Sequence, residues 1–238
     1  MKKNYLTGLA LLPIFWTVST AIGLAVAYTI AVSLQHTRPF LPFISQIGVH
    51  QPERTITKTA TTVSCIIDVA VKTLNYKFNK LYRPKFRWIY NILLLCVGLL
   101  SCSGFIFAGY VRGEDWLRGH QSASFVGFSM GAAYNIFQCL LYSVTPARRK
   151  SLRMIYYRIF VCAITVLPMI AFIVSDGVCM ILNSCDKELL ENAHPLLEWV
   201  GMFGLLCFMP TYAMEIQIIG LTDPSHIQGT CQMTVVKY

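Results

Sequence analysis

Six apolar segments alternate with shorter polar stretches along the chain. They lie roughly at residues 8–34, 57–75, 89–111, 120–145, 156–182 and 196–220. Each approaches or exceeds the roughly 20 apolar residues that a helix needs to cross a bilayer. The pattern predicts an all-α, polytopic membrane protein. Its six transmembrane helices would form one bundle within residues 1–220, and residues 221–238 would form a short cytosolic tail.

The composition excludes a water-soluble domain. Hydrophobic residues make up 55% of the 238 positions and charged residues only 13%, whereas soluble domains carry about 25% charge. The net charge of +9 comes from clustered basic residues, a pattern that fits membrane topology better than nucleic-acid binding. No CxxC pair occurs among the nine cysteines, so no metal or cofactor is predicted. Cys179 and Cys185 would share one compartment, and a disulfide between them is left open.

The basic residues predict the orientation of the chain. With the amino terminus in the cytosol, the cytosolic side receives Lys2, Lys3, the groups within 72–87 and 148–158, and Lys237. This asymmetry predicts that both termini are cytosolic. Aromatic residues are interleaved in both basic groups, which would suit anionic lipid headgroups. Plain anchoring of the helices explains the same residues.

The second apolar segment carries two charges, Asp68 and Lys72. An isolated charge at the centre of a membrane helix costs about 2.5–3.5 kcal/mol on insertion scales. Residues four positions apart share one helical face, so the two side chains are predicted to form an intramembrane ion pair that faces the bundle interior. A proton or ion pathway is the alternative interpretation.

The segment Pro39–Glu53 combines turn-forming and apolar residues. Its three prolines and Gly48 exclude regular helix or central strand, yet Phe40, Leu41 and Phe43 are too apolar for a solvated linker. We expect an ordered, proline-rich first loop on the non-cytosolic side. It would lie on the bilayer or on the ends of other helices.

This loop and several later blocks resemble the DRAM family, the DNA damage-regulated autophagy modulators. That family belongs to a wider group of six-span proteins that includes Sfk-like and FRAG/PGAP proteins. The loop matches the family signature at Pro39, Pro42, Phe43, Ile44, Ser45, Gly48, Pro52 and Glu53. Further matches are Trp16 and Tyr28, the block 98–102, His120, Phe128, Met130, Gly131, Tyr134, Glu198 and Trp199. The chain departs from the signature at Gln46, where the family usually has Asp, and at Ile47, where it has Thr.

The resemblance implies a lysosomal or endosomal membrane protein that promotes autophagy and influences cell death, with no catalytic activity. Its partners would be the lipid bilayer and proteins that the sequence does not identify. Two other branches of the wider group supply alternatives. One is a plasma-membrane scaffold that organises phosphoinositide kinase, and the other is a GPI-anchor lipid-remodelling factor.

Polar residues gather at the predicted non-cytosolic helix ends. His36, His50 and His120 lie there, and histidine titrates near pH 6.5. One hypothesis is that luminal acidity tightens the first loop over the bundle. His120 and Glu198 open two spans on the same side and would form a hydrogen-bonded pair. Ordinary helix-end polar residues would look the same, and no spacing selects a nucleophile for an enzymatic role.

Two further patterns concern helix packing. The spacing of Gly127 and Gly131 is typical of close helix contacts, within the bundle or between two copies of the chain. Pro168 and Pro210 are expected to kink the fifth and sixth spans.

Overall fold

The computed structural model describes residues 8–82, 88–111, 113–143, 151–182 and 187–221. All regular structure in these ranges is helical. The elements are η1 (Gly8–Leu11), α1 (Leu12–Ser33), α2 (Ile44–Ile47), α3 (Glu53–Tyr82), α4 (Trp88–Tyr110), α5 (Gly113–Ser143), α6 (Leu152–Leu182), α7 (Lys187–Phe208), η3 (Met209–Tyr212) and α8 (Ala213–Leu221).

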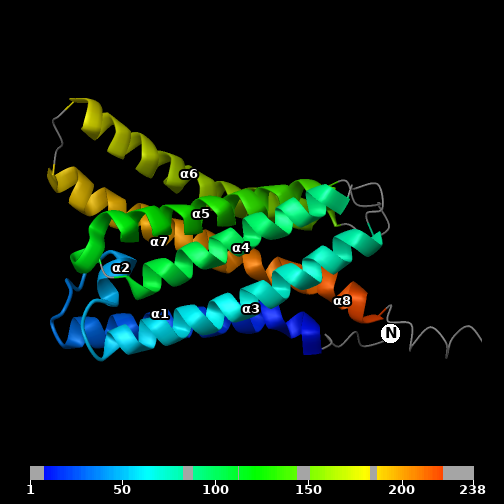
Figure 1. Cartoon of the computed structure of the whole chain (residues 1–238), viewed down its shortest axis with the longest axis horizontal. Coiled ribbons are helices and arrows are strands. Elements are labelled where there is room, and N and C mark those ends of the chain that lie inside the picture. The colour runs from blue at the N-terminus through cyan, green and yellow to red at the C-terminus, as the bar shows by residue number, and fades with distance from the viewer. Residues whose placement is uncertain (1–7, 83–87, 112, 144–150, 183–186, 222–238) are drawn as a thin grey trace, which may run out of the picture.

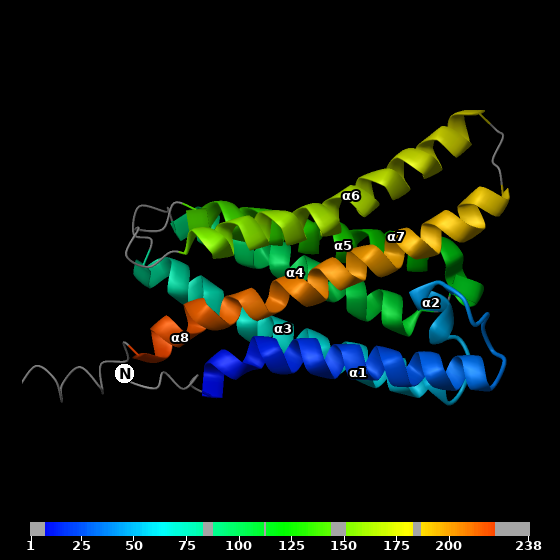
Figure 2. The same cartoon turned by 180° about the vertical axis from the view of Figure 1, so that it is seen from behind.

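The long helices run side by side along the longest axis of the molecule (Figures 1 and 2). Helix α3 packs against α1 and α4, α4 packs against α5, and α6 packs against α7. At one end of the bundle, η1 and α8 contact each other, so the two ends of the described chain meet there. The short helix α2 and the loop around it lie at the opposite end.

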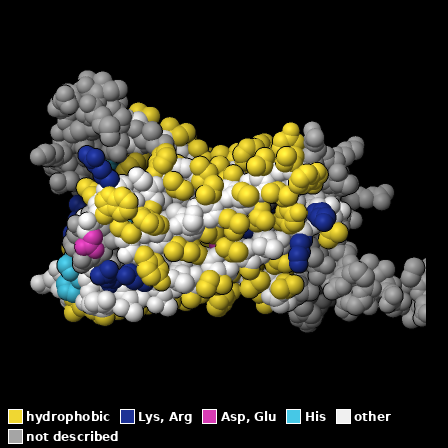
Figure 3. All heavy atoms as spheres, in the orientation of Figure 1, with side chains coloured by type: hydrophobic (Ala, Val, Ile, Leu, Met, Phe, Trp, Pro, Cys, Tyr) yellow, Lys and Arg dark blue, Asp and Glu magenta, His cyan; other side chains and the backbone are white. Residues whose placement is uncertain are grey.

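Among the described residues, five helical stretches are long and apolar enough to cross a membrane. They are Gly8–Ser33, Trp88–Tyr110, Asp115–Ser143, Leu152–Phe172 and Ala193–Gln217. Large apolar side chains such as Phe15, Leu100 and Phe160 are exposed on them, while polar residues such as Asn91 and Gln138 are buried. On the face in Figure 3, hydrophobic side chains cover the middle of the bundle and charged side chains lie toward its ends. This distribution is the reverse of a soluble protein's and fits a hydrocarbon surround.

Helix α3 does not reach the same apolar composition, and its two faces differ sharply. Ser64, Lys72 and Asn75 are buried against the neighbouring helices, whereas Val63 and Ile66 are exposed. The polar stripe therefore points into the bundle, as the Asp68–Lys72 spacing predicts.

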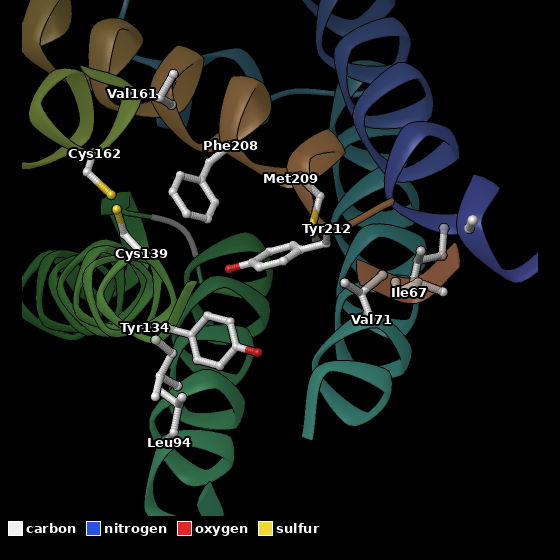
Figure 4. Packing of buried hydrophobic residues seen from close by; sticks show 13 residues of the cluster. Ile67, Val71, Leu94, Tyr134, Cys139, Val161, Cys162, Phe208, Met209 and Tyr212 are labelled. Atoms are coloured by element: carbon white, nitrogen blue, oxygen red, sulfur yellow. The ribbon is translucent and has the colours of Figure 1, made fainter. Parts of the chain in front are cut away.

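The last predicted span, 196–220, is interrupted. The α-helical hydrogen bonding of α7 ends at Phe208, and the 3₁₀ turn η3, which contains Pro210, separates it from α8. A proline in this position lacks the N–H that would continue the helix. Figure 4 shows Phe208 and Tyr212 from this region beside Tyr134 of α5, and these rings belong to the main buried cluster.

Small residues bring α4 and α5 into close contact. A Cβ on Gly104 would lie 2.5 Å from the Gly127 backbone nitrogen, and the Ser101 hydroxyl donates to the Gly127 carbonyl at 2.8 Å. Gly131 also faces Ser101. The Gly127 and Gly131 pattern thus serves packing within the bundle.

Candidate functional site

The first loop folds back onto the helix that precedes it. The Tyr28 hydroxyl donates to the Pro39 carbonyl at 2.5 Å. Ile47 of α2 is fully buried with Ala27 and Ala31 of α1. The departure from the family signature at Ile47 thus supplies an apolar anchor for the loop.

Two adjacent residues of α7 hold the same loop from the other side. The Ile44 N–H donates to the Glu198 carboxylate at 2.8 Å, and the Trp199 indole N–H donates to the Pro42 carbonyl at 2.8 Å. The Trp199 ring also meets Tyr28 edge-on, with the ring centroids 6.1 Å apart. The loop is therefore fastened to two helices that are distant in sequence.

Gly48 and Gln46 fit the loop's tight geometry. A Cβ on Gly48 would lie 2.5 Å from the Thr57 hydroxyl oxygen, so this signature position has no room for a side chain. The Gln46 side chain accepts a hydrogen bond from the Phe43 N–H at 3.3 Å. Gln46 thus closes the first turn of α2.

Beneath this loop lies a cavity of about 210 Å³. Residues of α1, α3, α4, α5, α7 and η3 surround it. Ser45, His120 and Glu198 line its loop end, and Asp68, Tyr134 and Tyr212 line the deeper part. The cavity thus joins the family-signature loop to the buried polar residues of the bundle, and we take it as the candidate site.

The deeper part contains a fully engaged lysine. Lys72 Nζ lies 2.6 Å from Asp68 Oδ2, 2.9 Å from the Gly98 carbonyl oxygen and 3.3 Å from Cys102 Sγ. It also lies 5.3 Å from the Tyr134 ring centroid. The structure therefore brings Asp68 and Lys72 together and adds partners from α4 and α5 that spacing alone does not indicate.

The three histidines expected at the non-cytosolic helix ends lie at two different places in the structure. His36 Nδ1 lies 2.6 Å from Oε1 of the buried Glu53, and the His36 and His50 rings are 4.9 Å apart. His120 instead lies at the cavity, where its Nδ1 is 2.8 Å from the Val111 carbonyl oxygen. The described contacts include no hydrogen bond between His120 and Glu198. Glu198 instead accepts from the Ile44 N–H.

The assignment of Arg158 to a headgroup-facing basic cluster was wrong. Arg158 is fully buried. It donates to Glu215 Oε1 at 2.8 Å, to the Thr211 hydroxyl at 3.0 Å and to the Thr211 carbonyl at 2.9 Å. These hydrogen bonds join η3 and α8 to α6. Lys72 is also buried, so it too is removed from the surface group.

Sequence reasoning missed this second ion pair, although a signal was present. Glu215 is an acidic residue inside an apolar span, and such a residue needs a partner in the bundle. Among the described residues, no group of three or more His, Cys, Asp and Glu side chains is placed to hold a metal ion. Cys185, one partner of the possible Cys179–Cys185 disulfide, and the tail from residue 222 lie outside what the structure describes.

Comparison with known proteins identifies the family. Residues 8–219 match the model of the Frag1/DRAM/Sfk1/Cwh43P N-terminal domain. The chain belongs to the Frag1/DRAM/Sfk1 family. This membership confirms the resemblance drawn from the loop, the His120 block and the Glu198–Trp199 pair.

Relatives within this family align over nearly the full chain. The human DNA damage-regulated autophagy modulator protein 1 is 22% identical over 94% of this chain and 98% of its own length. The mouse DNA damage-regulated autophagy modulator protein 2 is 25% identical over 93% and 89%. The zebrafish modulator of macroautophagy TMEM150B is 22% identical over 88% and 86%. No solved structure matches the chain.

Proposed function

We propose that this protein is a non-enzymatic, multi-pass protein of lysosomal or endosomal membranes that modulates autophagy. The observation that carries the proposal is the end-to-end alignment with relatives that are themselves named autophagy modulators. An influence on cell death is part of the same proposal. The protein would act through protein partners or through local lipids.

The proposal includes six membrane crossings. They are the five apolar helical stretches and α3, which would be the second crossing along the chain. Helix α3 has 30 residues, hence a length of about 45 Å at 1.5 Å per residue, which exceeds a hydrocarbon core of about 30 Å. Its low mean hydropathy comes from the polar stripe that the bundle buries, while Val63, Ile66 and Val69 face outward. An even number of crossings agrees with the contact between η1 and α8 at one end.

We further propose that the η1–α8 end is cytosolic and that the first loop is luminal. Lys77, Lys80 and Arg153 are exposed at or near the η1–α8 end, where they would attract anionic headgroups. The exposed Trp88 and Tyr156 lie near the same end and would anchor the helices at the interface.

A non-enzymatic role is supported by how the cavity's polar groups are used. Asp68 and Lys72 bind each other, the His120 Nδ1 binds a backbone carbonyl, and Glu198 binds a backbone N–H. These contacts hold the fold together. General acid–base catalysis would instead need such groups directed at a reacting atom.

The test combines localisation with autophagic flux. Cells that lack the protein should show altered flux, and the protein with an epitope in its first loop should restore it and co-localise with lysosomal or endosomal markers. The epitope should become accessible only after the organelle membrane is permeabilised. Normal flux together with surface localisation would contradict the proposal and favour the phosphoinositide-kinase scaffold. A changed GPI-anchor lipid composition would favour the remodelling factor.

A further inference from the structure

The cavity beneath the first loop contains one buried lysine whose donors are all in use. A lysine ammonium has three N–H donors. Those of Lys72 point to Asp68 Oδ2, the Gly98 carbonyl oxygen and Cys102 Sγ. Among the described residues that line the cavity, Lys72 is the one Lys or Arg. The described wall therefore presents no uncommitted lysine or arginine to a ligand.

Hydrogen-bond acceptors, in contrast, remain at both ends. An ionised carboxylate offers about four lone-pair sites, and the backbone N–H groups of Ile44 and Ser45 use two of those of Glu198. The Val111 carbonyl can only accept, so His120 Nδ1 carries a proton, and Nε2 is an acceptor whenever the ring is uncharged. At the deeper end, no described hydrogen bond engages Asp68 Oδ1.

The walls between these ends are apolar and aromatic. Trp16, Phe105, Phe128 and Met202 line them. Aromatic faces attract cations, and apolar walls favour an alkyl chain. A ligand that fits this lining carries a positive charge on a hydrocarbon body.

The dimensions favour a slender molecule. Thr57 and Asp68 both line the cavity from α3, and eleven residues of helix correspond to about 16 Å. The volume of about 210 Å³ is below the roughly 300–1,000 Å³ of ordinary small-molecule sites. A long cavity of small volume is narrow, so a single chain fits better than a ring system.

We propose that this cavity binds a single-chain amine. Its ammonium group lies at the loop end between Glu198 and His120, and its hydrocarbon chain runs along the aromatic wall toward Asp68. The inference goes beyond the proposed role in autophagy and does not depend on it. A purified protein tests it.

Charge distinguishes the amine from other single chains. A carboxylate of the same length would meet Glu198 as a like charge without an uncommitted lysine to neutralise it. An alcohol of the same length would fill the same walls but lose the charge-assisted hydrogen bond. The order of affinity among the amine, the alcohol and the carboxylate therefore tests whether the site prefers a positive charge.

The first experiment is calorimetric titration of the full chain in phosphatidylcholine nanodiscs, with empty nanodiscs subtracted. The probes are dodecylamine, dodecanol and dodecanoate. We expect saturable binding of dodecylamine, on the order of tenfold tighter than dodecanol, and no saturable binding of dodecanoate. The absence of saturable dodecylamine binding, or equal affinity for dodecanoate, would overturn the proposal.

Three variants locate the binding. Glu198→Gln keeps an acceptor for the Ile44 N–H but removes the charge, so dodecylamine affinity should fall about tenfold toward that of dodecanol. Asp115→Asn removes an exposed carboxylate of α5 that does not line the cavity, and it should bind like the wild type. Ser124→Leu narrows the cavity without touching Glu198 and should weaken the binding of both dodecylamine and dodecanol. Unchanged binding by both cavity variants would place the amine elsewhere and refute the site. If Glu198→Gln fails to fold, Ser124→Leu alone decides.

Two further probes then distinguish an amine that comes from the membrane from one that comes from solution. Sphinganine incorporated in the nanodisc represents a membrane lipid, and 1,12-diaminododecane added in solution represents a free amine. Displacement of dodecylamine by either supports the amine site and indicates its source. Displacement by neither would contradict it.

Discussion

Ile44 and Glu198 are 154 positions apart and are joined by a hydrogen bond of 2.8 Å. Glu198 is followed in α7 by Trp199, which holds Pro42 by its indole N–H. Two consecutive residues of one helix thus fix both the entry and the first turn of α2. The loop that carries the family signature is therefore a fastened part of the bundle.

Replacing Trp199 by Phe should loosen this loop while keeping an aromatic ring against Tyr28. The buried Pro42 carbonyl loses its donor, and an unsatisfied buried acceptor costs about 1–3 kcal/mol. Faster hydrogen exchange or proteolysis within residues 35–52 would report it. Trp88→Phe is the matched control because Trp88 is 72% exposed. Equal protection in both variants would show that the indole hydrogen bond contributes nothing.

Removing one partner of the buried Asp68–Lys72 pair should destabilise the protein more than removing both partners. Lys72→Met leaves a buried carboxylate without its cation, and such losses cost about 3–5 kcal/mol. The double variant Asp68→Asn, Lys72→Met should recover much of that loss. Thermal unfolding in detergent measures both. A double variant less stable than Lys72→Met would contradict a simple neutralising pair.

Gly98→Ala should destabilise the site beside Lys72. The added methyl would lie 2.7 Å from the Lys72 Cδ and 3.1 Å from the Tyr134 ring. Overpacking of this kind costs about 1–3 kcal/mol. Gly8→Ala has open space around the new methyl and should leave the melting temperature almost unchanged. Comparison of the two melting curves tests the packing around the lysine.

Arg158→Met should destabilise the end of the bundle near α8. The variant removes the donor that meets the buried Glu215, and the Thr211 carbonyl loses a partner as well. We expect a loss of about 3–5 kcal/mol, visible as a lower melting temperature and lower protein yield. Arg153→Met removes an exposed arginine from the same helix and serves as the control. If both variants lose equal stability, the buried pair is not the cause.

The contact between His36 and Glu53 predicts that His36→Phe loosens the first loop. His36 Nδ1 lies 2.6 Å from Glu53 Oε1, and the variant leaves this buried oxygen without its partner, which costs about 1–3 kcal/mol. Limited proteolysis of residues 35–52 measures the change. Cleavage at the wild-type rate would contradict a role for this contact.

The sequence indicated most long helices because lipid-facing helices must be apolar over their full length. The α3 segment was recognised despite its polar residues, since the spacing of Asp68 and Lys72 indicated an inward stripe. The contacts that the sequence does not indicate depend on packing between segments that are far apart in the chain. No local pattern relates Trp199 to Pro42. Arg158 looked like part of a surface charge cluster because sequence proximity to other basic residues says nothing about the direction of its side chain.

The interruption of the last span at Pro210 has a mechanical consequence. Tyr212 of the 3₁₀ turn lines the cavity, hydrogen-bonds Asn135 at 3.0 Å and stacks against the guanidinium that binds the following helix. Tyr212 therefore links the position of α8 to the lining of the cavity. A protein that binds α8 would have a route through Tyr212 to whatever occupies the cavity.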